Sequence, residues 1–157
     1  MASLKEFLRG DLIIADMKAI DKVGVIREFS ALLYAAGKVR DADELVRVLL
    51  ERESMGSTGI GDGVAIPHGK LHALSDVVVA FGRSHGGVEY ESLDDKPAYL
   101  FFLLVAPEDR PGEHLKMLAR ISRILKNPAL REKLRTVPDG RELHQMILEE
   151  DSKYPQK

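Results

Sequence analysis

The 157-residue sequence contains no cysteine, which excludes disulfide bonds, thiol catalysis and thiolate metal sites. It has no apolar run close to the roughly 20 residues that a transmembrane helix needs, and its first residues do not resemble a signal peptide. Acidic and basic residues are interspersed and leave a net charge of −2, so no basic block indicates nucleic-acid binding. We therefore expect a soluble cytoplasmic protein that neither enters a membrane nor binds nucleic acid.

The length and composition favour a single domain. With 45% hydrophobic residues, a chain of 157 residues can bury about two-thirds of the surface that it exposes when unfolded. The sequence contains no internal repeat and no linker-like segment. We predict one domain over residues 1–157, with a core from about residue 3 to residue 150.

The most unusual stretch runs from Arg52 to Lys70, with the sequence RESMGSTGIGDGVAIPHGK. It holds five of the 13 glycines, and such a density indicates positive φ angles or a close approach to the backbone. Successive free N–H groups in a loop of this kind can converge on an anion. The apolar run 64–66 predicts a strand that Pro67 ends, because proline has no N–H for the ladder. His68 would then be presented at a strand end, as a candidate reactive histidine.

Three familiar glycine or histidine motifs do not fit this stretch. A Walker A loop requires Gly-Lys followed by Ser or Thr, whereas Gly69 and Lys70 precede a leucine. A dinucleotide-binding fingerprint follows a strand and opens a helix, but the glycines of 59–63 follow a predicted helix and open a strand. A zinc-binding helix needs His-Glu-x-x-His, and the residues between His68 and His72 are Gly-Lys-Leu.

The pattern RExxxSTGIGxGxAIPHGK resembles the active-site signature of the type 2 enzyme IIA domains of the bacterial phosphoenolpyruvate-dependent phosphotransferase system. These domains form the mannitol, fructose and nitrogen-regulatory family. The resemblance implies that His68 accepts a phosphoryl group and becomes a phosphohistidine. His114, in the context Pro-Gly-Glu-His-Leu at a predicted helix start, matches the second histidine of the family, and Arg52 matches its motif arginine.

The chemistry of such a transfer is within reach of an imidazole. A neutral histidine is nucleophilic near pH 7, since its unperturbed pKa is about 6.5. Phosphoryl transfer then requires in-line placement and stabilisation of the charge on the equatorial oxygens. We expect this stabilisation from an N–H of His114, the hydroxyl groups of Ser57 and Thr58, and backbone N–H groups such as those of Gly59 and Gly69. Exchange between histidines of similar energy needs neither a metal nor another cofactor.

The resemblance also implies partners. The donor would be a small histidine phosphocarrier protein, and the acceptor in sugar transport would be a cysteine on a IIB domain. Because the sequence has neither cysteine nor an apolar span, we expect it to contain no IIB acceptor and no transporter. A free-standing IIA resembles the nitrogen-regulatory branch, which acts on regulatory target proteins. The alternatives are a separate fructose- or mannitol-type IIA with a IIB encoded elsewhere, and a regulatory module that binds an anion without covalent chemistry.

Periodicity predicts an α/β fold: a single domain with a mixed, mostly parallel sheet sandwiched by helices. The predicted helices cover residues 3–8 (with Ser3 as cap), 21–36, 41–53 and 111–125, with two shorter ones from Pro128 and Asp139. Besides residues 64–66, the predicted strands are 12–14, 76–83 and the central 98–106. Gly86 and Gly87 predict a turn, and the tail from Asp151 is expected to fray.

Three further histidines have less support as functional residues. We expect His72 to be incidental near the rim of the site, His85 to belong to a turn, and His144 to lie on the surface of a late helix. Each lacks the flanking pattern that singles out His68 and His114.

Overall fold

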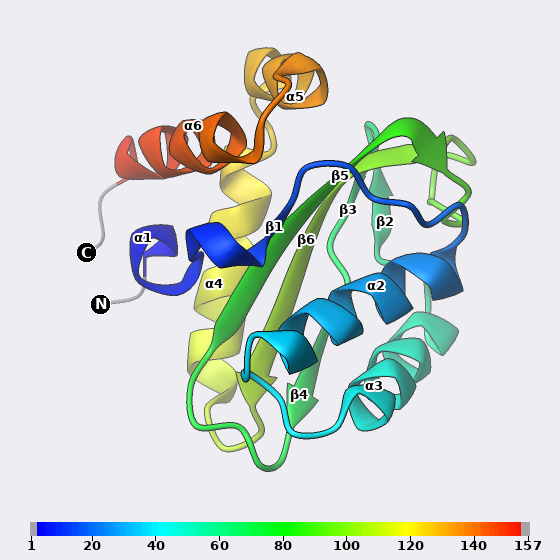
Figure 1. Cartoon of the computed structure of the whole chain (residues 1–157), viewed down its shortest axis with the longest axis vertical. Coiled ribbons are helices and arrows are strands. Elements are labelled where there is room, and N and C mark those ends of the chain that lie inside the picture. Colours follow the sequence, from blue (N-terminus) through cyan, green and yellow to red (C-terminus); the bar gives the residue numbers. More distant parts are fainter. Residues whose placement is uncertain (1–2, 155–157) are drawn as a thin grey trace.

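The computed structural model describes residues 3–154, in which helices cover both faces of one β-sheet (Figure 1). Strand β6 (Ala98–Pro107) is the central strand, as the sequence predicts, and it has three neighbours. It pairs antiparallel with β5 (Val78–Val88) and parallel with β3 (Val64–Ala65) and β4 (His68–Leu71). Both β3 and β4 pair with β6 on the side opposite β5, so Pro67 lies between two short strands that share one neighbour.

The sheet ends in two short edge strands. β1 (Ile13–Ile14) pairs in parallel with β5, and β2 (Gly59–Gly61) pairs antiparallel with β3. Within the described residues, three of the five strand pairings are parallel, although the antiparallel β5–β6 ladder is the longest. The prediction of a mixed sheet sandwiched by helices is therefore confirmed.

The helices separate into two layers with a hydrophobic core on each side of the sheet. Residues of α2 and α3 bury their apolar faces on one side, and residues of α4, α5 and α6 bury theirs on the other. Alternation along β5 serves both cores, since Val79 and Phe81 belong to the second core and Val78 and Ala80 to the first. The helices are α1 (Leu4–Phe7), the 3₁₀ helix η1 (Gly10–Leu12), α2 (Lys22–Ala35), α3 (Ala42–Ser54), α4 (Pro111–Ile124), α5 (Pro128–Thr136) and α6 (Gly140–Ser152).

Aspartate side chains fix the first turns of three helices. Asp21 accepts a hydrogen bond from the N–H of Gly24 at the start of α2, and Asp41 accepts one from Glu44 at the start of α3. Asp139 accepts two bonds from the first turn of α6. Each cap satisfies N–H groups that have no partner inside the helix, which is why these starts can be predicted from sequence.

The two ends of the described chain differ from the prediction. Ser3 precedes α1 but makes no side-chain cap bond. Asp151 does not begin a frayed tail: it is buried in the last turns of α6. Its carboxylate accepts hydrogen bonds from the N–H of Leu4 at 3.1 Å and from Nε of Arg120 at 2.5 Å. This pair joins α1, α4 and α6, a contact across 147 positions that no local pattern reveals. The end of the predicted tail, residues 155–157, lies outside the described residues.

Two local predictions in the sheet are also wrong. Residues 59–61, read as loop, form the strand β2. His68 follows the short strand β3, as predicted, and also begins a further strand, β4. Gly86 and Gly87 do not turn the chain, because β5 continues through them to Val88 with an irregular register opposite β6. Gly87 has a φ of 85°, which a glycine adopts without the steric cost of a Cβ.

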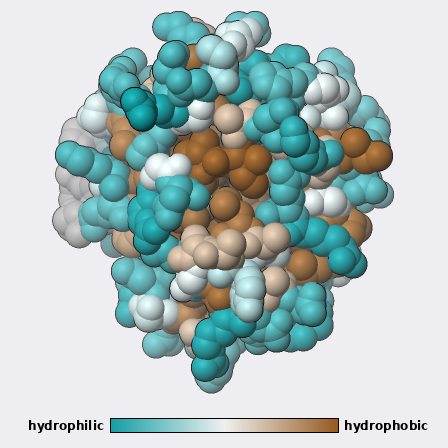
Figure 2. Space-filling model, in the orientation of Figure 1, coloured by the Kyte–Doolittle hydropathy of each residue, from teal (hydrophilic) through white to brown (hydrophobic). Residues whose placement is uncertain are grey.

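On the face that carries α2, hydrophobic residues gather in the middle and hydrophilic residues surround them (Figure 2). In the same orientation, β1 and β5 cross this area (Figure 1). The sheet edge on this side is thus only partly covered by helices. None of the helices within residues 3–154 combines the length and the hydropathy needed to span a bilayer.

Candidate functional site

The structure brings His68 and His114 together. His68 comes from the first position of β4 and His114 from the first turn of α4, and their ring centroids are 5.4 Å apart with an interplanar angle of 46°. His114 is buried and His68 is half-buried. Pro111 at the start of α4 sets the position of the second ring, because its fixed φ suits the first helical turn. Two imidazoles at this separation can contact one phosphoryl group placed beside both.

A backbone carbonyl determines which nitrogen of His68 is nucleophilic. Nδ1 lies 2.7 Å from the carbonyl oxygen of Ile66. A carbonyl only accepts hydrogen bonds, so Nδ1 must carry the proton and donate it. In the neutral ring the lone pair is then on Nε2. The Ile66–Pro67–His68 segment therefore fixes both the tautomer and the direction of the ring.

Both histidines are held in the neutral form near pH 7. Burial lowers the pKa of His68, and the positive charge of Arg52 lowers it further, against the hydrogen bond to Ile66. Burial lowers the pKa of His114 to about 4, with smaller contributions from the charges of His68 and Lys70. A neutral His68 keeps its lone pair, and a neutral His114 can still donate one N–H.

One atom of His114 has no hydrogen-bond partner among residues 3–154. Its Nε2 is buried, and within the described residues it makes no hydrogen bond. A buried polar atom left in this state costs about 1–3 kcal/mol, so native structures keep such atoms mostly where a ligand or water binds. The atom belongs to the ring that faces His68. A ligand oxygen bound beside both rings could accept a hydrogen bond from this atom.

Lowered histidine pKa values predict a loss of stability in acid. His114 titrates near 6.5 when unfolded and near 4 when folded, so the unfolded chain binds more protons between these values. The free energy of unfolding should therefore fall as the pH drops from 6.5 toward 4, by up to about 1.4 kcal/mol per pH unit. Denaturant unfolding at pH 7 and pH 5 should show a smaller difference for His114→Gln than for the unchanged protein. Equal pH dependence in both would contradict this origin.

Arg52 borders the site from the end of α3. It lies in the last turn of that helix, where its Nη1 donates to the carbonyl of Gly56 at 2.9 Å. Its positive charge contributes to the lowered pKa of His68. The guanidinium retains further N–H donors for an anion. Arg52, His68 and His114 thus come from three separate elements to one region.

Ser57, Thr58 and Gly59 already have partners within the protein. The Ser57 hydroxyl donates to the carbonyl of Tyr90 and accepts from the N–H of Gly59, while Thr58 is bonded to Glu53 through both its N–H and its hydroxyl. These groups hold the loop in place, so the structure does not present them as free donors. Their direct contact with a phosphoryl group stays a prediction.

Close packing accounts for two glycines of the stretch. A Cβ on Gly69 would lie 2.9 Å from a methyl carbon of Val48 in α3, and one on Gly59 would lie 2.9 Å from the Cα of Ser92. Distances this short require the backbone to approach its neighbours without a side chain. Gly69 is therefore needed to pack β4 against α3. The prediction that its N–H contacts the phosphoryl group is untested.

Sequence reasoning did not single out Glu53, whose contacts hold the loop beside the site. It is 7% exposed, and its carboxylate accepts hydrogen bonds from Thr58 and, at 3.1 Å, from the Tyr90 hydroxyl. The ammonium of Lys22 lies 3.1 Å from the same carboxylate. One buried side chain thus ties the glycine-rich loop to α2 and to the segment after β5. An available signal was a glutamate in the last turn of a helix, where the dipole disfavours a negative charge.

The remaining histidines lie outside this cluster. His72 is 91% exposed and 3.6 Å from the carboxylate of Glu108, and His85 is an exposed residue of β5. His144 does not lie freely on the surface as expected, because its Nε2 is 2.6 Å from the carbonyl of Leu8. It contributes to the contact between α6 and the chain after α1.

Comparison with known proteins gives a family for this arrangement. The profile of the family described as "Phosphoenolpyruvate-dependent sugar phosphotransferase system, EIIA 2" matches residues 6–150. The chain is 40% identical over 131 residues to the fructose-specific EIIABC component of Bacillus subtilis, covering 83% of this chain but only 21% of that longer protein. It is 35% identical over 146 residues to a nitrogen regulatory protein of Bradyrhizobium diazoefficiens, covering 92% of this chain and 94% of that one.

Solved structures agree with the sequence relatives. The nitrogen regulatory protein IIA-Ntr of Neisseria meningitidis superposes with a TM-score of 0.85 at 33% identity, over 92% of this chain and 98% of that one. The profile match includes all three residues of the site, Arg52, His68 and His114. The chain belongs to the EIIA 2 family of phosphoryl carriers of the phosphoenolpyruvate-dependent phosphotransferase system.

Proposed function

We propose that His68 is the phosphoryl acceptor of this carrier and that the donor is the phosphohistidine of a small histidine phosphocarrier protein. The observation that carries this assignment is the buried Nε2 of His114, which has no hydrogen-bond partner within residues 3–154, in a ring whose centroid lies 5.4 Å from that of His68. A phosphoryl group on Nε2 of His68 would supply an acceptor oxygen for that atom. This satisfies a polar group that the protein alone leaves unpaired.

The transfer follows from the positions of the nitrogens. The Nε2 lone pair of His68 forms a bond to phosphorus while the phosphorus–nitrogen bond of the donor breaks, and the bonding pair returns to the donor ring. Positive charge that develops on the His68 ring is stabilised by the Ile66 carbonyl at Nδ1. Arg52 and the N–H of His114 take up charge on the phosphoryl oxygens. Such stabilisation is most of what a protein must contribute to a loose phosphoryl-transfer transition state.

Two exposed apolar side chains belong to the segments that carry the site residues. Leu115 follows His114 in α4 and is 64% exposed, and Met55, three positions after Arg52, is 78% exposed. A small apolar area of this kind suits short-lived docking of carrier proteins. Phosphorylation adds nearly two negative charges beside it, so a partner that buries the area would distinguish the two forms.

We further propose that the carrier is of the nitrogen-regulatory kind, acting on regulatory target proteins in the cytoplasm. The similarity to the Bradyrhizobium protein supports this, since it extends over 94% of that protein. The alternative is a fructose- or mannitol-type IIA that passes its phosphoryl group to a IIB cysteine, which the 40% identity to the fructose-specific component favours. Rapid transfer from the phosphorylated chain to a IIB domain in vitro would support the sugar-transport role.

Phosphoryl uptake tests the proposal directly. Incubated with a phosphorylated histidine phosphocarrier protein, the chain should gain one phosphoryl group that is labile in acid and stable in base, as a phosphoramidate is. His68→Ala should take up none, whereas His72→Ala should behave as the unchanged protein, because His72 is solvent-exposed and apart from the site. Intact-mass measurement of all three proteins gives the result. Uptake that persists in His68→Ala would refute the assignment.

A further inference from the structure

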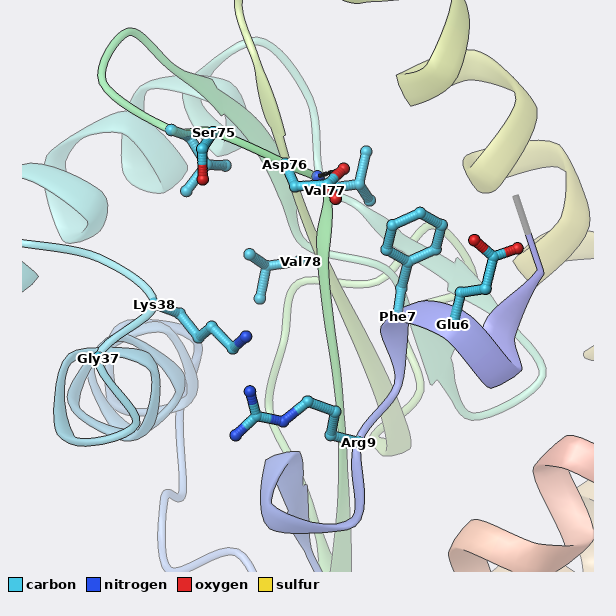
Figure 3. A pocket seen from close by; sticks show the side chains of 10 residues that line it. Glu6, Phe7, Arg9, Gly37, Lys38, Ser75, Asp76, Val77 and Val78 are labelled. Atoms are coloured by element: carbon cyan, nitrogen blue, oxygen red, sulfur yellow. Dashed lines mark hydrogen bonds between the residues drawn. The ribbon is translucent and has the colours of Figure 1, made fainter. Parts of the chain in front are cut away.

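A cavity of about 320 Å³ lies on the open edge of β5, apart from the histidine site. Figure 3 shows the side chains of Val77 and Val78 on opposite sides of β5. The cavity therefore lies against the edge of the β5 backbone. Phe7 borders the cavity on one side. The volume is at the lower end of the roughly 300–1,000 Å³ that is usual for ligand sites.

The backbone along this edge has no strand beside it. β1 pairs with β5 only at Phe81 and Gly82, and within residues 3–154 no other strand pairs with this side of Val78–Ala80. An unpaired edge of this kind can accept an added strand through main-chain hydrogen bonds. The N–H of Val77 already donates to the carboxylate of Asp76 at 2.8 Å, so the free part of the edge is Val78–Ala80. At about 3.3 Å per residue, this length matches a segment of about three residues.

The charges at the two ends of the cavity differ in sign. Arg9 and Lys38 reach toward the same space at the end nearer β1, and Asp76 lies at the start of β5 (Figure 3). Asp11 pairs with Arg9, so two cations and one carboxylate leave an excess of one positive charge. Arg110 lies 3.5 Å from Asp76, and Glu6 lines the side next to Phe7. The positive end of the cavity therefore lies next to the point where β1 begins to pair with β5.

We propose that this edge binds the extended C-terminal segment of a partner protein, added as a strand parallel to β5, with its terminal carboxylate between Arg9 and Lys38. The segment has to stop there, because β1 occupies the same edge at Phe81. A strand parallel to β5 ends in a carboxylate at that position, opposite the excess positive charge. An antiparallel strand would place its amino terminus beside the two cations.

A library of random peptides with free C-termini on a common carrier tests this proposal. Peptides selected on the unchanged protein should bind at least tenfold more weakly as C-terminal amides and at least tenfold more weakly to Lys38→Gln. Lys126→Gln is the matched control, since Lys126 is an exposed lysine beside a different cavity, and it should bind them normally. In amide NMR spectra, the shifts on binding should centre on residues 77–80.

Three results would overturn the proposal: no peptide that prefers the unchanged protein over Lys38→Gln, equal binding of acids and amides, or shifts confined to other elements. In each case the charges of Arg9 and Lys38 would instead serve to prevent the open edge of β5 from pairing with a strand of another chain. The spectrum of Lys38→Gln also checks that this variant is folded. Its phosphoryl uptake should be unchanged, so failure of this proposal leaves the role of His68 untouched.

Discussion

Replacing His114 by alanine should slow phosphoryl uptake by His68 about 100- to 1000-fold, the usual effect of removing one positioned donor from a transition state. The acceptor nitrogen is still present in His114→Ala, because His68 is unchanged and its Nδ1 is still bonded to the carbonyl of Ile66. His114→Ala should therefore reach the same final yield of phosphorylated protein as the unchanged protein, but more slowly. Rapid-quench measurement of uptake from the phosphorylated donor gives the rate.

Two variants separate a donor role from a packing role of His114. His114→Gln keeps an N–H donor in a side chain of similar reach and should recover part of the rate. Leu115→Ala removes an exposed neighbour and should leave the rate of the chemical step unchanged, although it alters the docking area. If His114→Ala and His114→Gln were as fast as the unchanged protein, His114 would have no part in transfer.

Glu53→Ala should have the largest effect on stability of any change near the site. It leaves Lys22 without its buried partner and removes the acceptor for Thr58 and Tyr90. Breaking a buried ion pair by removing one partner typically costs about 3–5 kcal/mol. Denaturant unfolding should show this loss, and uptake by the fraction that remains folded should also be slower, because the loop before His68 loses its anchor.

The control for this experiment is Glu51→Ala, two positions earlier in α3 at an exposed site. It should change the free energy of unfolding by less than about 0.5 kcal/mol, as surface substitutions usually do. Glu53→Gln keeps two acceptor lone pairs but loses the charge opposite Lys22, so its stability should lie between those of Glu53→Ala and the unchanged protein. Equal free energies of unfolding for Glu51→Ala and Glu53→Ala would show that the buried contacts of Glu53 make no net contribution to stability.

Elements with a local signal could be predicted from the sequence. The aspartate caps at 21, 41 and 139 and the apolar periodicity behind them define three helices within a residue or two at their starts. The apolar run of β6 identifies the central strand, because a strand buried on both faces needs no polar positions. The α/β class can also be predicted, because the predicted helices and strands alternate along the chain.

Features that depend on distant partners could not be predicted. β2 is only three residues long and rich in glycine, and it becomes a strand because β3 lies beside it. The anchor at Glu53 requires Lys22 and Tyr90, which are 31 and 37 positions away. The meeting of His68 and His114 depends on the placement of α4 against β4. The family resemblance names both histidines as site residues, whereas neither spacing nor periodicity links them.

The position of the phosphoryl group on the imidazole tests the account most directly. With histidine labelled with ¹⁵N, NMR spectra of the phosphorylated protein show which ring nitrogen is bonded to phosphorus. We expect the bond at Nε2 of His68, with Nδ1 still protonated and bonded to the carbonyl of Ile66. A phosphoryl group on Nδ1 of His68, or on any other histidine, would contradict the account.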